Sequence, residues 1–460
     1  MCETEDDVIR AGQYVIVKKS KFRKLYRVVP NGILMLRKNR VEMHEIIGKR
    51  FWTTFAIVPL TSKKGGYRAV EVTETESLND LLTQLPSGSD NRSIMDDGTS
   101  QKLSKEEIVQ LQESGKSGRE IVGSLIHNNR SFLDRTEYSQ EKYLKKKEQK
   151  YLKYITICKP TISLLHDSFF TIDCNKISSL RMDILAQFLS YSDVQSDGLY
   201  ILYESGSLGL SAAAMLNRIG ANTDGRLIYL TPEYTSSHTI INAMNFPAEQ
   251  LQRLISINIY TFFKLYHKGE SAVKRNALRL DGTRDNTAAI ASNNNVPSES
   301  MGVQSDTVNA LSCNIPSEII DEDGTNCDLK RKLSDSDKDE TLEANTPSKP
   351  KWLLKAHDAV ELVRGTKARG LAIVANEHPE NIVTALLPFL GASRPFVIYH
   401  AYKEPLQQMY MTLKQTHKVL NLKLFSNFLR SYQVLPDRTH PDILTTGADG
   451  FLLTGYLVEK

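Results

Sequence analysis

Residues 199–230 carry the pattern that most limits what this chain can fold into. A continuous apolar run at Leu199–Tyr203 predicts a buried strand, and Gly206 marks a turn directly after it. A helix is predicted at 210–219 and a second strand at 227–230. Strand, glycine turn, helix and strand in this order open a doubly wound parallel sheet. We therefore expect an α/β domain around this segment.

The α/β pattern continues on both sides of a long polar stretch. A helix at 181–189 precedes the first strand, and after residue 350 the chain predicts helices at 352–363 and 381–390 and strands at 371–374, 396–399 and 451–458. Between them, 268–350 is rich in Ser, Asn, Asp, Thr and Glu, and such a segment cannot bury enough surface to offset its ordering entropy. We expect a doubly wound domain formed by 156–267 and 351–460, interrupted by a disordered acidic and polar insertion at 268–350.

The N-terminal part has a different periodicity. Short β-rich runs at 14–17, 25–29, 33–36 and 51–58 alternate with turns. Pro30-Asn31-Gly32 predicts a hairpin, because Asn and Gly tolerate the positive φ angles of tight hairpin turns, and 96–98 predicts a further turn. We expect a small β-barrel within residues 1–100.

Residues 101–155 predict a helical connector. Ser104 with Glu107, and Ser117 with Glu120, have the spacing of a capping box, in which a hydroxyl and a carboxylate satisfy the amides at a helix start. A third helix, rich in lysine, is predicted at 137–152.

Composition excludes several classes of protein. At 460 residues the chain should hold two or three domains. Its apolar runs are far shorter than the roughly 20 residues of a membrane-spanning helix, and its acidic start is unlike a secretory signal, so we expect a soluble intracellular protein. Five scattered cysteines without a C-x-x-C pair, and ten histidines without an H-E-x-x-H motif, predict reduced thiols and no metal site.

The turn after the first strand is where a cofactor would be expected. Doubly wound methyltransferases bind S-adenosylmethionine on a turn that reads acid-x-Gly-x-Gly-x-Gly, whose glycines let the backbone approach the cofactor. Here the turn begins with Glu204 and Gly206, but Leu208 and Leu210 stand where the second and third glycines belong. We expect each leucine to put a bulky side chain into the volume that the cofactor would fill.

Two further positions depart from that pattern. The second strand should end in an Asp or Glu that takes the ribose hydroxyls, but it runs into Thr231-Pro232, with Glu233 out of register. The fourth strand should lead into a polar motif such as Asp-x-Pro-x-Pro, and here it leads into 375–379, Ala-Asn-Glu-His-Pro. One such change is more often an ordinary turn. Three together predict no bound cofactor and no catalytic residue in this chain.

Two basic segments favour nucleic acid as a partner. Residues 142–154 carry six lysines with three interleaved tyrosines. Lysines could contact phosphates and tyrosines could stack on unpaired bases, which suits RNA better than duplex DNA. The alternative is a solvated helix face whose buried stripe is Tyr143, Leu144, Tyr151 and Leu152.

The second basic segment lies in the β-rich part of the chain. Its members are Lys18, Lys19, Lys21, Arg23, Lys24, Arg27, Arg37, Lys38 and Arg40. The alternative here is protection of an exposed strand edge, which lysines commonly provide. Two basic segments beside a cofactor domain that lacks its cofactor residues favour an RNA-holding role.

Several longer stretches resemble one family. They are Asp96–Leu103, Thr136–Tyr138 with the lysine run, Arg181–Gln187, Ser393–Phe396 with Tyr402–Leu406, and Tyr432–Pro441. Over almost its whole length outside 268–350, the chain resembles the non-catalytic subunits of the eukaryotic tRNA (adenine-58-N1) methyltransferase. The resemblance implies an N-terminal β-barrel joined to a degenerate, Rossmann-like methyltransferase domain.

The resemblance also implies a function. This chain would be a non-catalytic subunit that grips tRNA, while a homologous catalytic subunit carries S-adenosylmethionine and methylates N1 of adenine 58. It implies a heterotetramer of two plus two subunits and a nuclear location. The tRNA contacts carried over onto this sequence are Ser100, Gln101, Lys102, Lys142, Lys145, Lys146, Lys147, Lys150, Lys153, Tyr154, Lys176, Arg181 and Arg438.

Two other functions stay open at this point. One is a stand-alone RNA methyltransferase with an atypical donor pocket, in which Glu204 or Glu233 takes the ribose. The other is an RNA-binding scaffold, similar to a translation factor, that needs no enzymatic partner. Donor binding by the isolated chain would favour the first, and co-purification of a methyltransferase would count against the second.

Overall fold

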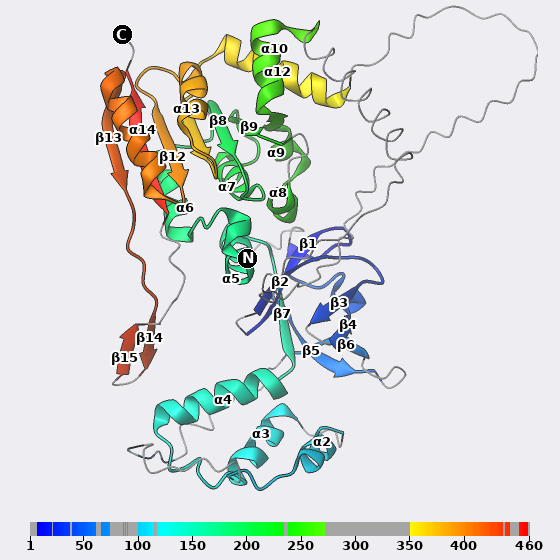
Figure 1. Ribbon diagram of the computed structural model, residues 1–460. Helices are drawn as coiled ribbons and strands as arrows, with labels where there is room; N and C mark the ends of the chain where they lie inside the picture. The colour runs from blue at the N-terminus through cyan, green and yellow to red at the C-terminus, as the bar shows by residue number, and fades with distance from the viewer. Residues whose placement is uncertain are drawn as a thin grey trace, which may run out of the picture. The chain divides into compact units, whose positions relative to one another are not determined.

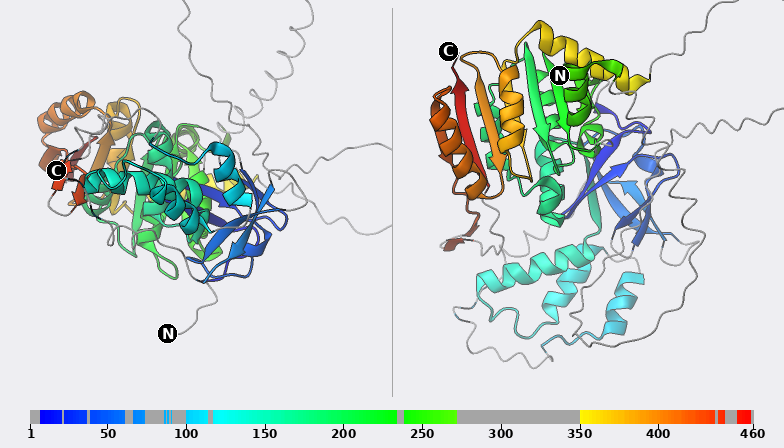
Figure 2. Two further views of the ribbon diagram at one scale, coloured as in Figure 1. Left: turned by 90° about the horizontal axis from the view of Figure 1, so that it is seen from below. Right: turned by 45° about the horizontal axis from the view of Figure 1, so that its top comes forward.

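The computed structural model describes residues 7–20, 22–36, 39–60, 66–73, 86, 88, 90, 100–113, 117–233, 238–271, 350–435, 438–441 and 450–458. Met1–Lys268 together with Trp352–Lys460 is one compact unit. It holds a β-barrel, a helical module and a doubly wound sheet (Figures 1 and 2). Most of the insertion expected at 268–350, and the turn expected at 96–98, lie outside the described residues.

The first sheet has the strand order β2-β1-β7-β5-β6-β4-β3. The strands are Tyr14–Lys19 (β1), Phe22–Arg27 (β2), Ile33–Leu36 (β3), Asn39–Glu42 (β4), Thr54–Pro59 (β5), Gly66–Glu71 (β6) and Tyr154–Cys158 (β7). Alternate residues such as Val15, Val17 and Leu34 point into its core. The outer strands approach each other, since Lys24 Nζ on β2 donates a hydrogen bond to the Met35 carbonyl on β3 at 3.1 Å. The expected small β-barrel is confirmed.

One detail of the barrel differs from expectation. Pro30-Asn31-Gly32 does turn the chain, and the Gly32 N–H donates to the Val29 carbonyl at 2.9 Å. However, the strands on either side are not hydrogen-bonded to each other, because β2 pairs with β1 and β3 pairs with β4. The hairpin predicted at this turn is therefore wrong. Turn chemistry is local, whereas strand pairing is decided by the whole sheet.

The strand β7 comes from beyond the helical connector. It lies between β1 and β5 and pairs with both in antiparallel register. The boundary expected between residues 155 and 156 falls inside this strand, because the chain returns from the helices to complete the barrel. The helical module is thus an excursion from the barrel, attached at both of its ends.

Three helices form the module, and their starts follow the predicted caps. They are Lys105–Glu113 (α2), Gly118–His127 (α3) and Glu137–Tyr151 (α4). Ser117 and Glu120 form a complete capping box at α3. At α2 the Ser104 N–H and the Glu107 carboxylate lie 2.8 Å apart, and the reciprocal bond is 3.2 Å. Apolar residues of α3 and α4 pack into a small core of their own.

The second sheet has the strand order β10-β9-β8-β11-β12-β16-β13. The strands are Leu199–Glu204 (β8), Arg226–Thr231 (β9), Leu254–Asn258 (β10), Gly370–Val374 (β11), Pro395–His400 (β12), Val419–Phe425 (β13) and Phe451–Leu457 (β16). The first five in this order run parallel, and β16 is antiparallel to both of its neighbours, β12 and β13. The expected doubly wound domain is confirmed.

Helices cover both faces of this sheet, since every residue of β8, β11 and β12 is buried. They are Ile162–Ile172 (α5), Met182–Tyr191 (α6), Leu210–Ile219 (α7), Thr239–Ala243 (α8), Ala248–Gln252 (α9), Ile259–Lys268 (α10), Lys351–Gly365 (α12), Glu380–Leu386 (α13) and Lys403–Thr416 (α14), with 3-10 turns at Cys174–Ile177 (η3) and Leu387–Phe389 (η4). A further 3-10 turn, His44–Ile46 (η2), belongs to the barrel. A hairpin of Tyr432–Leu435 (β14) and Arg438–Pro441 (β15) follows β13.

Specific polar contacts join the barrel to the sheet domain. The Tyr14 N–H donates to Asn245 Oδ1 at 2.8 Å, and Asn245 Nδ2 donates back to the Tyr14 carbonyl at 2.8 Å. Arg23 on β2 lies 3.5 Å from the Asp167 carboxylate on α5. Ile16 of the barrel strand β1 belongs to the core of the sheet domain. The two parts therefore share packing as well as a chain connection.

Candidate functional site

The turn between β8 and α7 turns its acidic residue inward. The Glu204 carboxylate is 2% exposed and accepts hydrogen bonds from the backbone N–H groups of Gly209 at 2.8 Å and Ala212 at 3.1 Å. The Ser207 hydroxyl donates a third. Burial raises the pKa of Glu204 to about 7, although these hydrogen bonds oppose the rise. The carboxylate thus holds the turn and the start of α7 together.

The open side of Gly206 is already occupied. Gly206 has a φ of +76°, and a Cβ there would lie 2.0 Å from Asn376 Nδ2 and 3.5 Å from Ser178 Oγ. Ser178 Oγ also donates to the Ser205 carbonyl at 3.1 Å. Two segments, one after η3 and one after β11, therefore cover the backbone that a cofactor would have to approach.

The polar motif after β11 binds the same turn. The Glu377 carboxylate accepts hydrogen bonds from the Tyr203 hydroxyl and, at 2.6 Å, from Ser205 Oγ. The Asn376 N–H donates to Ser205 Oγ at 2.9 Å. Burial and the neighbouring Glu377 carboxylate raise the pKa of Tyr203. Residues expected to face a substrate at this position instead fasten the ends of two adjacent strands to each other.

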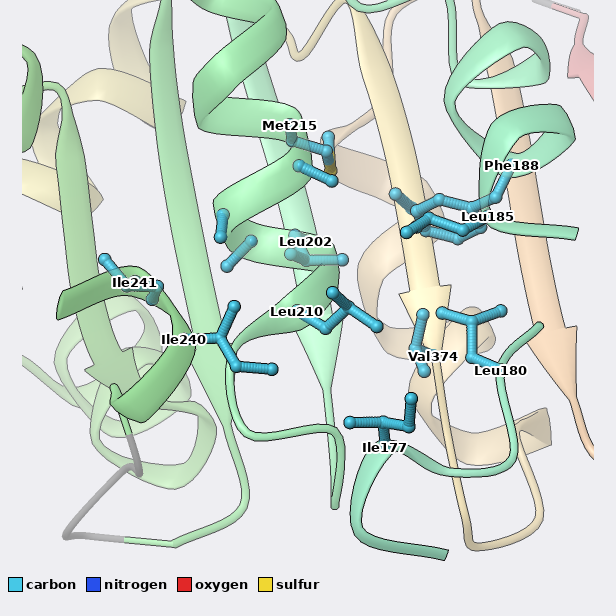
Figure 3. Packing of buried hydrophobic residues seen from close by; sticks show 14 of the residues in the cluster. Ile177, Leu180, Leu185, Phe188, Leu202, Leu210, Met215, Ile240, Ile241 and Val374 are labelled. Carbon is cyan, nitrogen blue, oxygen red and sulfur yellow. The ribbon is translucent and has the colours of Figure 1, made fainter. Parts of the chain in front are cut away.

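Leu210 belongs to the hydrophobic core. It is fully buried, and Figure 3 shows it between Ile240 and Val374, with Ile177 beneath it. The expectation that Leu210 projects from the turn into a cofactor volume is wrong, because this first residue of α7 turns its apolar side chain inward. Leu208 is half-buried against the same core, with a φ of +54° that residues other than glycine rarely adopt. The turn therefore keeps a glycine-like backbone while its side chains serve packing.

Thr231 at the end of β9 is also used internally. It is buried, and its hydroxyl donates to the Glu233 carbonyl at 3.0 Å. Glu233 itself is exposed. No carboxylate at the end of this strand is therefore buried and held in place for a ribose, among the residues that the structure describes. With Glu204 inside the turn and Asn376 over Gly206, the residues present do not fit S-adenosylmethionine.

Helix α4 has one apolar face and one basic face. Leu144 and Tyr151 are buried, and the Tyr143 ring meets Phe132 edge to face with centroids 5.3 Å apart. The hydroxyls of Tyr143 and Tyr151 are buried as well. The suggestion that these two tyrosines stack on bases is therefore wrong, and the alternative of a buried stripe is confirmed. Positions four apart share one helix face, and here that face packs on α3.

Four lysines form what we call the α4 basic face: Lys142, Lys145, Lys146 and Lys150, all exposed. Lys145 also pairs with Glu141 one turn earlier. Lys147 is half-buried, and its Nζ lies 4.9 Å from the centroid of the Tyr143 ring and 6.0 Å from that of the Tyr151 ring. Lys150 also lies over the Tyr151 ring, at 5.1 Å, but stays exposed. Burial lowers the pKa of Lys147. Lys147 thus covers the edge of the module's core.

Of the three predicted loop residues, Lys102 alone is exposed. Gln101 Nε2 donates to the Leu125 carbonyl at 2.9 Å, and the Ser100 carbonyl accepts the Arg130 N–H at 2.9 Å. These bonds fix the loop on the end of α3. Ser100 and Gln101 therefore position the loop, and Lys102 presents a charge beside the module.

The remaining predicted contacts are scattered. Lys153 and Tyr154 are half-buried at the end of α4, where Lys153 Nζ lies 4.9 Å from the centroid of the Tyr67 ring, and Lys176 is exposed on η3. Arg438 lies in β15, and its side chain is outside the described residues. The His440 ring of that strand meets the Tyr138 ring of α4 edge to face, with centroids 6.3 Å apart, so the hairpin reaches the helical module.

Arg181 is engaged within the protein. Its guanidinium donates to both carboxylate oxygens of Asp183, at 3.0 and 2.7 Å, and to the Asn427 carbonyl at 2.8 Å. Only 11% of its side chain is exposed. Arg181 therefore anchors the chain that leaves β13, and the structure does not bring it together with the α4 basic face.

The basic segment of the barrel serves the fold in part. Lys18 and Arg23 stand opposite each other on β1 and β2, Arg23 pairs with Asp167, and Lys24 helps to close the barrel. Lys18 and Arg27 are exposed, and Lys21, Arg37 and Lys38 lie outside the described residues. Because β2 is an outer strand, protection of a sheet edge accounts for several of these charges.

In the part of the chain that the structure describes, no helix is both long and apolar enough to cross a membrane. No three side chains of His, Cys, Asp or Glu there gather as the ligands of a metal ion would.

Comparison with known proteins decides the family. Residues 8–290 match the model of the Gcd10p family, which is more than half of the sequence. The chain belongs to the Gcd10p family. A mouse relative, tRNA (adenine(58)-N(1))-methyltransferase non-catalytic subunit, is 31% identical over 98% of this chain and 89% of its own. The relative of the same name from Dictyostelium discoideum is 25% identical over 100% and 81%. A solved SAM-dependent O-methyltransferase from Thermotoga maritima, 9% identical, covers 100% of this chain and 98% of that chain at a TM-score of 0.45.

This Gcd10p-family chain has two surfaces that the sequence reasoning missed. One is the apolar surface of the segment from Ser426 to Pro441, which we call the C-terminal arm, where Phe428 is 86% exposed and Val434 74%. Sequence reasoning had marked only its last part, as a family stretch at Tyr432–Pro441 with Arg438 as a tRNA contact. The pair Phe428-Leu429, which stands among polar and charged residues, was the signal that could have found this surface. The other is a cavity of about 600 Å³ between the barrel and the sheet domain. Its lining comes from residues more than 200 positions apart, so no local motif marks it.

Proposed function

We propose that this chain is the non-catalytic, tRNA-binding subunit of a tRNA (adenine-58-N1) methyltransferase. The observation that carries the proposal is the match over 98% of the chain to a mouse relative of that name. The geometry of the turn supports the non-catalytic part, because Glu204, Asn376 and Leu210 all serve internal contacts. The chain is not a methyltransferase by itself, and a homologous catalytic subunit holds S-adenosylmethionine.

The α4 basic face is the proposed main contact with tRNA. Its lysines project from a helix whose opposite side is fixed by a core, so their charges are presented on a firm support. Lysine contacts with phosphates release counterions and make binding depend strongly on salt. Lys102 and the hairpin carrying Arg438 border the same module and extend the proposed contact.

The first part of the C-terminal arm, residues 426–431 ahead of the β14–β15 hairpin, is the proposed contact with the catalytic subunit. It follows β13, an outer strand of the sheet, whose backbone edge is open to pairing among the described residues. Exposed Phe428 and Leu429 give this part of the arm an apolar surface, and such surfaces mark protein interfaces. Arg181 and Gln187 hold its base by hydrogen bonds to Asn427. We further propose assembly as two plus two subunits in the nucleus.

Reconstitution tests the proposal directly. Methyl transfer to tRNA is measured for this chain, for the catalytic subunit and for the co-expressed pair, and donor binding is measured by calorimetry. We expect methyl transfer only from the co-expressed pair, and no donor binding by this chain. Transfer by the isolated chain would show that the turn can accept the donor after all.

A charge reversal tests the tRNA contact in the assembled pair. Lys142→Glu, Lys146→Glu and Lys150→Glu together should lower tRNA affinity on the order of 100-fold near physiological salt and flatten its salt dependence. The matched control is Lys268→Glu, Lys403→Glu and Lys414→Glu, three exposed lysines on α10 and α14 with the same change in net charge. Equal losses of tRNA affinity in both variants would mean that the α4 basic face is only solvated and does not contact tRNA.

A further inference from the structure

The cavity of about 600 Å³ lies at the seam between the barrel and the sheet domain. Gln13 and Phe51 line it from the barrel, Asn217 and Met244–Pro247 line it from the sheet domain, and Lys159–Ser163 line it from the connection between β7 and α5. The paired hydrogen bonds between Tyr14 and Asn245 hold its two sides together. Sites for small ligands span roughly 300–1,000 Å³, so one nucleotide fits this volume.

The lining carries the chemistry that recognises a nucleotide. Of the described residues that line the cavity, Lys159 alone is charged, and none has a carboxylate. Asp7 lies 3.6 Å from Lys159 Nζ but is 63% exposed, so solvent weakens its effect on the local charge. The half-buried ring of Phe246 offers a stacking surface, and the amides of Gln13 and Asn217 can bond base edges. The Phe51 ring is 7% exposed, and Lys159 Nζ lies 5.9 Å from its centroid, so Phe51 supports the wall and the lysine.

The backbone beside the cavity is strained. Trp52 follows the lining residue Phe51 and has a φ of +71°, in the left-handed region where a bulky side chain is costly. Its N–H donates to the Ile157 carbonyl on β7 at 2.6 Å, and its side chain is 56% exposed. Strain of this kind persists where the surrounding structure fixes it, commonly at binding sites.

We propose that this cavity takes one unpaired nucleotide of the bound tRNA, an inference that rests on the proposed function. Strand β7 leads from Lys153, at the end of α4, to Lys159 in the cavity wall. At about 3.3 Å per residue these lysines are about 20 Å apart, a distance that a few nucleotides span. An RNA strand held by the α4 basic face therefore reaches the cavity, where Lys159 contacts phosphate and a base packs on Phe246.

Crosslinking locates the nucleotide. The co-expressed pair is irradiated with tRNA that carries 4-thiouridine, and crosslinked peptides are identified by mass spectrometry. We expect peptides containing Phe51 or Met244–Pro247 in addition to peptides of α4. Crosslinks to α4 without these would overturn the cavity proposal and leave the proposed function standing. Failure of the pair to bind tRNA at all would overturn both the cavity proposal and the proposed function.

A variant that fills the cavity gives a second test. Asn217→Trp, at an exposed position of the lining, should lower tRNA affinity about tenfold and abolish the cavity crosslinks, with the melting temperature and pairing with the catalytic subunit unchanged. The matched control is Asn242→Trp, at an exposed asparagine on α8 outside the lining, which should change neither the tRNA affinity nor the cavity crosslinks. Unchanged affinity and crosslinks in Asn217→Trp would overturn the proposal.

Two measurements separate a nucleotide of tRNA from a free nucleotide. Lys159→Ala should reduce the slope of log affinity against log salt by about 0.7–0.9, the value for one lost phosphate contact. Free AMP should not bind the pair at submillimolar concentration, because the proposed occupant is held chiefly through the rest of the RNA. Tight AMP binding that tRNA does not compete away would overturn the assignment to tRNA.

Discussion

The turn after β8 and the helix α4 both place polar side chains beside an apolar core, but they direct them differently. In the turn, Glu204 and Ser205 bond to the protein's own backbone and side chains. On α4, Lys142 and Lys146 point into solvent while the tyrosines close the core. A region that resembles a cofactor site has become structural, and a region without a catalytic motif presents the charge. The turn and α4 therefore differ less in which polar residues they carry than in whether those residues point into the protein or into solvent.

The largest expected effect is a loss of stability in Leu210→Ala. It tests whether the turn is structural, as the comparison with α4 holds, or only a blocked cofactor site. Leu210→Ala should lower the free energy of unfolding by about 2–5 kcal/mol, because it removes a fully buried side chain and leaves a cavity. Thermal and denaturant unfolding measure the loss, and calorimetry should still find no donor binding. Leu429→Ala, at an exposed position of the arm, serves as the control. An undiminished stability accompanied by donor binding would mean that Leu210 merely blocks a working pocket.

Glu204 supplies the next effect, which depends on pH. Burial raises the pKa of Glu204 in the folded protein to about 7, above its ordinary value of 4.5, so between these values the folded state keeps a proton that the unfolded state releases. Stability from this group is complete below about pH 4.5, is lost as pH rises, and is absent above about pH 7. The loss is on the order of 3 kcal/mol.

The pH dependence is measured as a difference between two proteins. Denaturant unfolding of the natural chain and of Glu204→Gln is followed from pH 4 to pH 8, so that all other titrating groups cancel. The stability of the natural chain relative to Glu204→Gln should fall across this range. A difference that stays constant would place the Glu204 carboxylate in contact with solvent, and the turn would then resemble α4.

Local patterns predicted the five inner strands of the sheet, β9, β8, β11, β12 and β16, but missed the two outer strands, β10 and β13. Helix 210–219 was predicted with its observed bounds, and strand β8 to within one residue, because an apolar run and a glycine mark each end. What fills the turn could not be predicted, since Asn376 reaches Gly206 from 170 residues away. The leucines were noted as departures from a motif, but whether Leu210 points outward or inward depends on Ile177 and Val374, which the fold brings beside it.

The basic residues show the same limit. Lysine spacing on α4 identified an exposed face, yet the interleaved tyrosines allowed two interpretations until α3 was seen to cover them. Arg181 matched a family stretch and proved to bind Asp183. Charge in a sequence shows that a residue can meet an anion, and only its neighbours decide whether that anion is inside the protein.

The smallest effect sharpens the comparison within α4 itself, between two adjacent lysines. Lys146 is exposed, so Lys146→Ala should weaken tRNA binding by the assembled pair a few-fold and lower the salt slope by about 0.7–0.9. Lys147 lies over the rings of Tyr143 and Tyr151, so Lys147→Ala should leave tRNA affinity nearly unchanged and cost about 0.5–1 kcal/mol of stability. Filter binding at several salt concentrations and thermal unfolding measure both quantities. Equal losses of tRNA affinity would place Lys147 in the basic face, and the division of α4 into a binding side and a packing side would have to be redrawn one residue further round the helix.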